Sequence, residues 1–274
     1  MVHVVLAGGA GNVGREVLDV LVERQKYQLT VFTRTEAIDL AALGVNVVQV
    51  DYNDKDMLTG PAQKNLIDAC IKAGVKRFAP SEWATYWNTA YSNLGWFMNY
   101  LSFPYPSTKH LQIFGLQYDL QNRSAIVPAD RDFPMTLTKV QDLAKVVAEA
   151  IDYEGQWPEK RGISGSRITN SELIELADSI RGPFEIETVQ AEAIEAGELN
   201  TSWVPLIELP SMPPGTDVRA FSEAGISSVL TGALSGTWAV SDEWNKLLPD
   251  LKMTTVQEFL RDIWGGKHGG GSPK

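Results

Sequence analysis

The stretch "LAGGAGNVG" (residues 6–14) constrains the fold of this chain more than any other. It places Gly8, Gly11 and Gly14 three residues apart, between an apolar run that predicts a strand and an apolar stripe at helical spacing. The first glycine permits a tight turn, the second lets the backbone approach a pyrophosphate, and the third lets the helix pack close to the strand. In this context the stretch predicts a dinucleotide-binding loop, with a plain glycine turn as the alternative.

The segments around this loop predict a β-α-β-β-α-β order. Short β-branched runs indicate the strands and apolar stripes indicate the helices, at residues 3–7, 12–23, 29–33, 45–50, 63–73 and 76–80. Strands that alternate with helices predict an α/β fold in which helices cover a mainly parallel sheet.

One strand of this architecture is missing from the sequence. It should lie within "DYNDKDMLTGPAQKNLIDAC" (residues 51–70), where no apolar β-branched run is present. The crossover from 50 to 76 is still long enough for a parallel connection, so strand 76–80 could pair directly with strand 3–7. A covered sheet without its central strand would leave buried amides unpaired, at a cost of about 1–3 kcal/mol each.

The second half of the chain predicts a further set of elements. Helices are expected over 138–152 and 169–181, each with a capping box, Thr138 with Gln141 and Thr169 with Glu172; Gly182 ends the second helix. A short strand is expected at "RGISG" (161–165) and a last helix over 253–264, while the prolines of 204–215 predict an irregular segment. With no clear linker, we expect a single two-lobed unit.

The second strand ends in "FTR" rather than in an acidic residue. An Asp or Glu at this position would bind the ribose 2′-hydroxyl and disfavour a 2′-phosphate. Arg34 instead offers a planar guanidinium that suits a phosphate, so NADP(H) is the predicted cofactor, and a solvated loop arginine is the alternative.

Composition narrows the classes of partner. The formal net charge of −10 and the lack of a basic run disfavour nucleic acid and anionic lipid. A single cysteine, Cys70, excludes an intrachain disulfide and favours a reducing compartment. We expect a cytoplasmic protein, because no signal peptide and no apolar run of about 20 residues is present. Three scattered histidines predict no metal site.

Several motifs resemble, in order, those of the NmrA-like and isoflavone reductase-like families, which are atypical short-chain dehydrogenases. They are "GGAGNVG", "VFTR", "DYNDKD", "AGVKRFAPSEWA", "GWFMNYL" and "GSRITNSELIELA", and they extend over most of the chain. The resemblance implies a Rossmann-like doubly wound lobe that binds NADP(H), placed at residues 1–152, and a smaller, partly interleaved substrate lobe at 153–274.

The resemblance also implies roles for individual residues. The pyrophosphate would contact Gly8, Ala10, Gly11, Asn12, Val13 and Gly14, and the 2′-phosphate would contact Thr33 and Arg34. The nicotinamide would lie near Ser81, Gly95 and Phe97.

Measured against these families, the chain is short at two places. Relatives have a strand with parts of its flanking helices where this chain passes from Gly60 to Pro61, and a helix and a sixth strand between Ala84 and Gly95. The second region carries the catalytic lysine of the related enzymes, and no lysine lies between Lys76 and Lys109 here. The catalytic residues are therefore unassigned. We expect the native polypeptide to contain further residues at both places, with real deletions as the alternative.

"YPSTK" gives Tyr105 and Lys109 the Tyr-x-x-x-Lys spacing of short-chain dehydrogenases. That spacing serves catalysis only when one helical face carries both residues. Pro106 disfavours a helix through Tyr105. We therefore predict that this pair is not catalytic.

A dense run of aromatic residues follows strand 76–80, at the end of a strand where such sheets bind ligands. It predicts an aromatic or apolar substrate in contact with Trp83, Trp87, Trp96 and Tyr100, with core packing as the alternative. The predicted function is an NADPH-dependent reductase of a small aromatic or enone-like metabolite. The alternative is a non-catalytic NADP(H) sensor that binds a protein partner; a homodimer is possible for either.

Overall fold

The computed structural model describes residues 1–34, 36–50, 61–79, 95–129, 132–210 and 212–266. The chain divides into two compact units, Met1–Trp83 and Ala84–Lys274. This division differs from the expected lobes at 1–152 and 153–274, which describe a division by function and stay a prediction.

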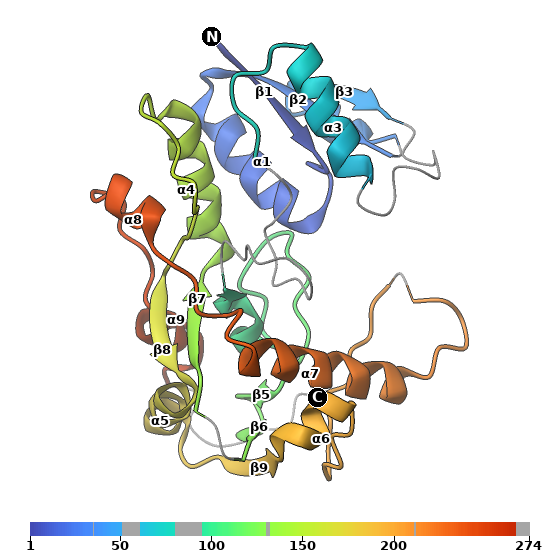
Figure 1. Ribbon diagram of the computed structural model, residues 1–274, viewed down its shortest axis with the longest axis vertical. Helices are drawn as coiled ribbons and strands as arrows, with labels where there is room; N and C mark the ends of the chain where they lie inside the picture. The colour runs from blue at the N-terminus through green and yellow to red at the C-terminus, as the bar shows by residue number, and fades with distance from the viewer. Residues whose placement is uncertain (35, 51–60, 80–94, 130–131, 211, 267–274) are drawn as a thin grey trace. The chain divides into compact units, whose positions relative to one another are not determined.

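The N-terminal unit is built on a parallel three-stranded sheet (Figure 1). Its strands are β1 (Val2–Ala7), β2 (Tyr27–Thr33) and β3 (Asn46–Gln49), in the order β1-β2-β3. Its helices are α1 (Asn12–Arg24), α2 (Ile38–Ala41) and α3 (Pro61–Lys72). Helix α1 buries its predicted apolar stripe, including Leu18 and Leu21, and contacts β1 and β2. The order β-α-β at the glycine stretch is thus confirmed.

The C-terminal unit holds two further three-stranded sheets. One has the order β4 (Trp96–Phe97), β7 (Pro134–Thr138), β8 (Ser166–Thr169), and the other the order β5 (Tyr118–Asp119), β6 (Ser124–Pro128), β9 (Glu185–Val189). Strands β4 and β7 are parallel, as are β6 and β9, whereas β8 and β5 pair antiparallel to their neighbours.

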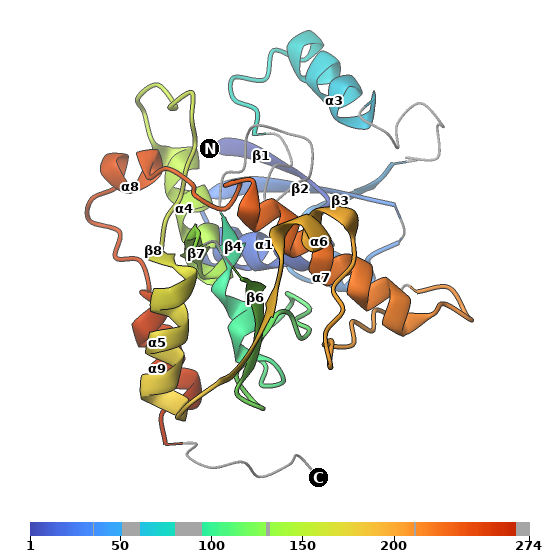
Figure 2. The ribbon, with the colours of Figure 1, turned by 60° about the horizontal axis from the view of Figure 1, so that its bottom comes forward.

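Helices surround these two sheets. They are the 3-10 helix η1 (Met98–Ser102), α4 (Val140–Asp152), α5 (Asn170–Arg181), α6 (Ala191–Ala196), α7 (Val218–Leu234), α8 (Glu243–Leu247) and α9 (Val256–Trp264). Helices α5 and α9 lie side by side (Figure 2). Trp238, Phe259 and Trp264 are fully buried in one core with strand residues such as Ile126 and Leu137.

Three predicted details are wrong. The first is the strand at 76–80: residues 76–79 form no strand, and Pro80 lies outside the described residues. A strand needs a neighbour to satisfy its backbone amides, and none of the described strands pairs with this segment.

The second correction concerns the start of α4. The Thr138–Gln141 capping box does not form, because the helix begins at Val140, after Lys139 as its N-cap residue. The Thr138 hydroxyl donates instead to the carbonyl of Ile163, at 3.1 Å. By contrast, the Thr169–Glu172 box is present, and α5 ends at Gly182 as predicted.

The third correction concerns "RGISG". Residues 161–165 form no strand, and β8 begins just after them at Ser166. Side chains at the start of α8 bond their amides: Gly162 donates to Glu243 at 3.1 Å, and Ser164 donates to Asn245 at 2.9 Å. These bonds replace the partners that a strand would require.

The expected absence of a membrane span and of a metal cluster can be compared only with the described residues. Among the described residues, no helix has the length and apolar character needed to cross a bilayer. The same residues contain no group of three potential metal ligands.

Candidate cofactor-binding site

The glycine loop folds back tightly between β1 and α1. Gly8 has φ of +76°, a left-handed conformation that L side chains rarely adopt, and its amide donates to the carbonyl of Phe32 in β2 at 3.2 Å. The amide of Gly11 then donates to the carbonyl of Gly8 at 2.9 Å. The first glycine of the motif is therefore required by backbone conformation.

Gly14 is required by a close approach. A Cβ atom at this position would lie 2.3 Å from the carbonyl oxygen of Gly8 and 2.9 Å from the Cα of Gly9. Gly9 is constrained as well, because its Cβ would lie 2.9 Å from the Val31 side chain. The motif analysis predicted Gly14 but missed Gly9, whose signal is the Gly-Gly doublet.

The N-terminus of α1 begins without a side-chain cap. Gly11 is the N-cap residue, with φ −81° and ψ 169°, and the first turn contains no acidic residue. The first amides of a helix lack intrahelical acceptors and carry a partial positive charge. With a glycine cap and no acidic residue in its own first turn, this helix start fits the pyrophosphate of a dinucleotide. Ala10, Asn12 and Val13 lie at this turn, and their contact with a pyrophosphate stays a prediction.

The C-terminal end of β2 lies beside this loop, as the pairing of Ala7 with Phe32 shows. Thr33 is buried and its carbonyl accepts from Val50, at 2.8 Å, whereas Arg34 is exposed. Gln49 at the end of β3 donates to the backbone carbonyl of Arg34 at 3.2 Å. The exposed guanidinium of Arg34 can therefore meet a phosphate, while Thr33 holds the backbone beneath it.

The sequence interpretation missed Arg15, in the first turn of α1. Its guanidinium lies 2.5 Å from the carboxylate of Asp39, and this hydrogen bond lowers the pKa of Asp39. The ion pair joins α1 to α2 next to the loop. No local sequence pattern marks Arg15, because its partner Asp39 lies 24 residues away in the chain.

The predicted nicotinamide and substrate residues fall in or next to the C-terminal unit. Ser81, Trp83 and Trp87 lie outside the described residues. Gly95 has φ of +64°, and a Cβ there would lie 2.2 Å from the carbonyl oxygen of Thr136 in β7. The packing of β4 on β7 thus explains this glycine without a ligand. Phe97 is buried in β4.

Trp96 and Tyr100 belong to an aromatic cluster. Trp96 stacks on Trp238 at 5.6 Å between ring centroids and on Tyr100 at 5.9 Å. Tyr100 also contacts Phe114 at 5.0 Å, and burial raises the pKa of Tyr100 to about 12. Trp96 is therefore at least a core residue, and a substrate role for these two residues stays a prediction.

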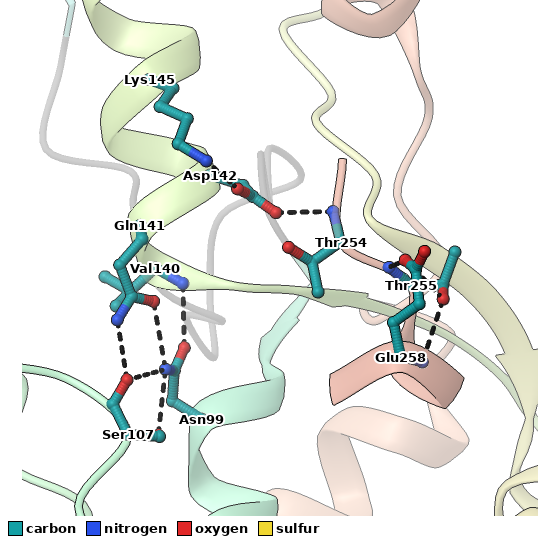
Figure 3. A network of polar contacts seen from close by, with 9 residues as sticks. All are labelled: Asn99, Ser107, Val140, Gln141, Asp142, Lys145, Thr254, Thr255 and Glu258. Atoms are coloured by element: carbon teal, nitrogen blue, oxygen red, sulfur yellow. Dashed lines mark hydrogen bonds and ion pairs between the residues drawn. The ribbon is translucent and has the colours of Figure 1, made fainter. Parts of the chain in front are cut away.

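A buried polar network follows directly after Phe97 (Figure 3). The Asn99 side chain accepts from the backbone amide of Val140 at 2.9 Å, which caps α4 from 41 residues away. Its amide group donates to the Ser107 hydroxyl at 3.2 Å and to Gln141 at 3.3 Å. Gln141 in turn donates to the Ser107 carbonyl at 2.7 Å. Asn99 therefore ties η1, the segment at Ser107 and α4 together.

A second polar junction lies in the same first turn of α4 (Figure 3). Asp142 is buried, accepts from the backbone amide of Thr254 at 2.7 Å and pairs with Lys145 at 2.9 Å. Charged acceptors make the stronger hydrogen bonds. Asp142 thus fixes the approach to α9, and neither junction could be read from local sequence spacing.

Tyr105 and Lys109 do not share a helical face, because residues 103–110 form no helix. The Tyr105 ring packs edge-on against Trp264 at 5.2 Å. The prediction that no helix runs through this pair is confirmed.

Comparison with known proteins shows which chains and structures this protein is similar to. No protein-family model matches the chain. It is similar to the oxidoreductase swnN of Metarhizium robertsii, with 22% identity over 338 aligned positions that cover 96% of this chain and 98% of the relative.

Two solved structures share the fold. Triphenylmethane reductase from Citrobacter sp. gives a TM-score of 0.62 at 16% identity, covers 96% of this chain and 99% of that structure, and was also solved with NADP(H). A structure of isoflavone reductase gives a TM-score of 0.59 at 15% identity, covering 95% of this chain and 99% of that structure. The predicted Rossmann-like α/β class and the resemblance to isoflavone reductase-like proteins are confirmed. The names of these relatives agree with the predictions of an oxidoreductase and of NADP(H).

Proposed function

We propose that this protein is an NADPH-dependent reductase of a small aromatic or enone-like metabolite. The observation that carries the proposal is the uncapped start of α1 at Gly11, directly after the tight turn that Gly8 and Gly14 permit. The exposed Arg34 at the end of β2 favours the 2′-phosphate of NADP(H) over the free hydroxyl of NAD(H). The reductases among the structural relatives support the reaction class.

The proposed roles of the residues follow from these positions. Bound NADPH supplies a hydride for the substrate. The loop residues and Arg34 hold and orient the phosphates, while Ser81, Gly95 and Phe97 are proposed to line the nicotinamide. Trp83, Trp87, Trp96 and Tyr100 are proposed to contact an apolar ring of the substrate, and a side chain or water protonates the product. The triphenylmethane compound named for one structural relative is an aromatic substrate of that protein, which supports this class.

A non-catalytic NADP(H) sensor is the second candidate. It is favoured by the lack of a lysine between Lys76 and Lys109, the interval in which related enzymes carry their catalytic lysine. In this role the protein would bind a protein partner or a second copy of itself rather than turn over a metabolite. A cytoplasmic location suits either role.

One experiment separates the two candidates. The protein is titrated calorimetrically with NADPH and with NADH, and NADPH oxidation is then followed with a panel of enones, quinones and aromatic ketones. Tight NADPH binding with turnover of one panel member supports the reductase. Tight binding without turnover supports the sensor, and binding of neither cofactor contradicts both.

A variant tests the exclusion of Lys109 from catalysis. If turnover is found, we expect Lys109→Ala to keep kcat within about tenfold of the parent, which is about 1.4 kcal/mol. Loss of a general acid typically costs about 10²–10⁴-fold. A fall of that size with unchanged NADPH affinity would show that the Tyr105–Lys109 pair is catalytic.

A further inference from the structure

The side chain of Arg15 uses few of its hydrogen-bond donors. In the part of the chain that the structure describes, it makes one hydrogen bond, from Nη1 to the carboxylate of Asp39 in α2, at 2.5 Å. A guanidinium carries five N–H donors and binds a carboxylate best through two parallel bonds. Here a single carboxylate oxygen is bound, and Nε of Arg15 is buried without a partner. The pair with Asp39 therefore leaves Arg15 able to bind a further acceptor.

The partner of Arg15 is open to solvent. The side chain of Arg15 is 19% exposed, whereas that of Asp39 is 67% exposed. An ion pair with an exposed partner contributes little to stability, because water competes for the same carboxylate. The hydrogen bond from Arg15 nevertheless lowers the pKa of Asp39, so this carboxylate is charged at neutral pH. Arg15 can therefore exchange Asp39 for a stronger anionic acceptor at little cost.

The position of Arg15 relates it to both ends of the candidate cofactor site. Its backbone belongs to the first turn of α1, where its amide donates to the carbonyl of Gly11 at 2.8 Å. Its guanidinium reaches Asp39 in α2, which follows Arg34 by five residues. The side chain thus extends from the helix start proposed for the pyrophosphate to the segment that follows the arginine proposed for the 2′-phosphate.

We propose that Arg15 is a second recognition residue for the 2′-phosphate of NADP(H), and that Asp39 is an internal competitor for its guanidinium. A phosphate carries more negative charge than a carboxylate and offers three acceptor oxygens, so it is the stronger partner of an arginine. Binding then replaces Asp39 by the phosphate as the acceptor of Arg15. This inference rests on the NADP(H) binding of the proposed function and adds to Arg34 a second residue that selects the phosphorylated cofactor.

Calorimetric titration of Arg15→Met with NADPH and with NADH tests the recognition role. Methionine keeps an unbranched stem on α1 and removes every donor. We expect the affinity for NADPH to fall about tenfold and that for NADH to change less than about twofold, because NADH lacks the 2′-phosphate. Arg24→Met, in the last turn of α1, is the matched control. Equal losses for the two cofactors, or an unchanged NADPH affinity, would overturn the role.

The competition is tested by Asp39→Asn, in which a neutral amide replaces the carboxylate. We expect NADPH to bind about twofold to fivefold more tightly, the range that an exposed ion pair would cost. Asp68→Asn, an exposed residue of α3, is the control for net charge. In the Arg15→Met background Asp39→Asn should have no effect, because the competitor then has nothing to hold. Unchanged or weaker NADPH binding, or an equal gain in both backgrounds, would overturn the competition.

Titration of the parent protein separates a failure of this inference from a failure of the proposed function. If the parent binds neither cofactor, the proposed function is wrong and this inference is wrong with it. If the parent binds NADPH and the variants bind it as their controls do, this inference alone is wrong. Circular dichroism of each variant shows that it is folded. Should Arg15→Met not fold, Arg15→Gln takes its place, with the same expected loss of NADPH affinity.

Discussion

Helices α1 and α9 begin in opposite ways. At the start of α9, the Thr255 hydroxyl accepts from the amide of Glu258, and the Glu258 carboxylate accepts from the amide of Thr255 at 2.9 Å. At the start of α1, the N-cap is Gly11 and no side chain caps the helix. Both helices leave the same backbone amides to be satisfied. One satisfies them from its own sequence, and the other leaves them available to an anion.

Under the proposed function, this difference marks the place where the chain gives up local helix stability for binding. A Ser, Thr, Asp or Asn at the N-cap stabilises a helix by about 1 kcal/mol over an uncapped start. Besides α9, α5 has a capping box with Thr169, and α7 is capped by Asp217. Helix α4 obtains its cap from the distant Asn99. The short helices α2, α6 and α8 also start without a side-chain cap, but of the longer helices α1, α4, α5, α7 and α9, α1 alone does, and it follows the glycine loop.

Giving α1 a cap of its own should produce the largest effect. The backbone of Gly11 already has the extended conformation of an N-cap, so Gly11→Asp can cap the helix. The carboxylate would occupy the phosphate position, and we expect NADPH affinity to fall by about 100-fold or more, or about 2.7 kcal/mol. Calorimetric titration measures the affinity.

The matching stability measurement separates binding from folding. Urea unfolding of Gly11→Asp without cofactor should stay within about 1 kcal/mol of the parent. Gly11→Ala adds the Cβ without the charge and should weaken binding less. Unchanged NADPH affinity in Gly11→Asp would contradict the assignment of the loop to the pyrophosphate.

Removal of Arg34 should have the next largest effect. Hydrogen bonds to charged groups contribute about 1.5–3 kcal/mol, so Arg34→Ala should weaken NADPH binding by about 10- to 100-fold. NADH affinity should not change, because NADH lacks the 2′-phosphate. Arg24→Ala, at the other end of α1, is the control for net charge. Equal losses for the two cofactors would contradict the NADP(H) preference.

The cap supplied by Asn99 should matter for stability. Asn99→Ala leaves the buried amide of Val140 and the partly buried side chains of Ser107 and Gln141 without this partner. We expect the free energy of unfolding to fall by about 1–3 kcal/mol in urea. Asn122→Ala is the control, since Asn122 is exposed and bonds only locally to Asp119. Equal effects for the two variants would show that the network does not stabilise the fold.

The smallest effect is expected at the cap of α9. Thr255→Gly should reduce stability by a few tenths of a kcal/mol and leave NADPH affinity unchanged, because glycine is a tolerable N-cap. A change in cofactor affinity would show that the two helix starts are coupled.

The pH dependence of the same cap has a definite sign. Hydrogen bonds from Thr255, with the ion pair to Lys252, lower the pKa of Glu258 from 4.5 to about 2. A lowered folded-state pKa contributes stability above the unfolded pKa and loses it as the pH falls through the folded value. Lowering the pH from 4.5 to 2 should therefore reduce the free energy of unfolding of the parent more than that of Glu258→Gln. Parallel acid profiles of the two proteins would contradict this.

Much of the fold could be read from the sequence where the signal is local. The glycine loop, helix α1 and the Thr169–Glu172 box each depend on residues within a few positions of one another. The start of α4 could not be read in this way, because its cap is 41 residues away. The strand at 166–169 was misplaced because Glu243 and Asn245 hold the preceding residues.

In the candidate site, too, some residues can be explained from the sequence motif and others only from contacts in the folded structure. The left-handed backbone of Gly8 and the close approach at Gly14 could be expected from the motif alone, because both require a residue without a Cβ atom. Gly95 illustrates the other case: the family resemblance implied a place near the nicotinamide, and the structure shows that the backbone of Thr136 fills the space of its side chain. The pair formed by Arg15 and Asp39 also depends on contacts that no spacing rule predicts.

The sequence alone therefore predicted the α/β fold, which the structure confirms, and a glycine loop and an arginine whose roles toward a dinucleotide and a 2′-phosphate stay predictions. These features follow from the periods of strand and helix and from the conformational freedom of glycine. The tertiary structure decided which strands find partners, which helix starts are capped and which aromatic residues enter the core. Those outcomes depend on backbone groups and side chains far apart in the chain, whose hydrogen bonds and packing exist only once the chain has folded.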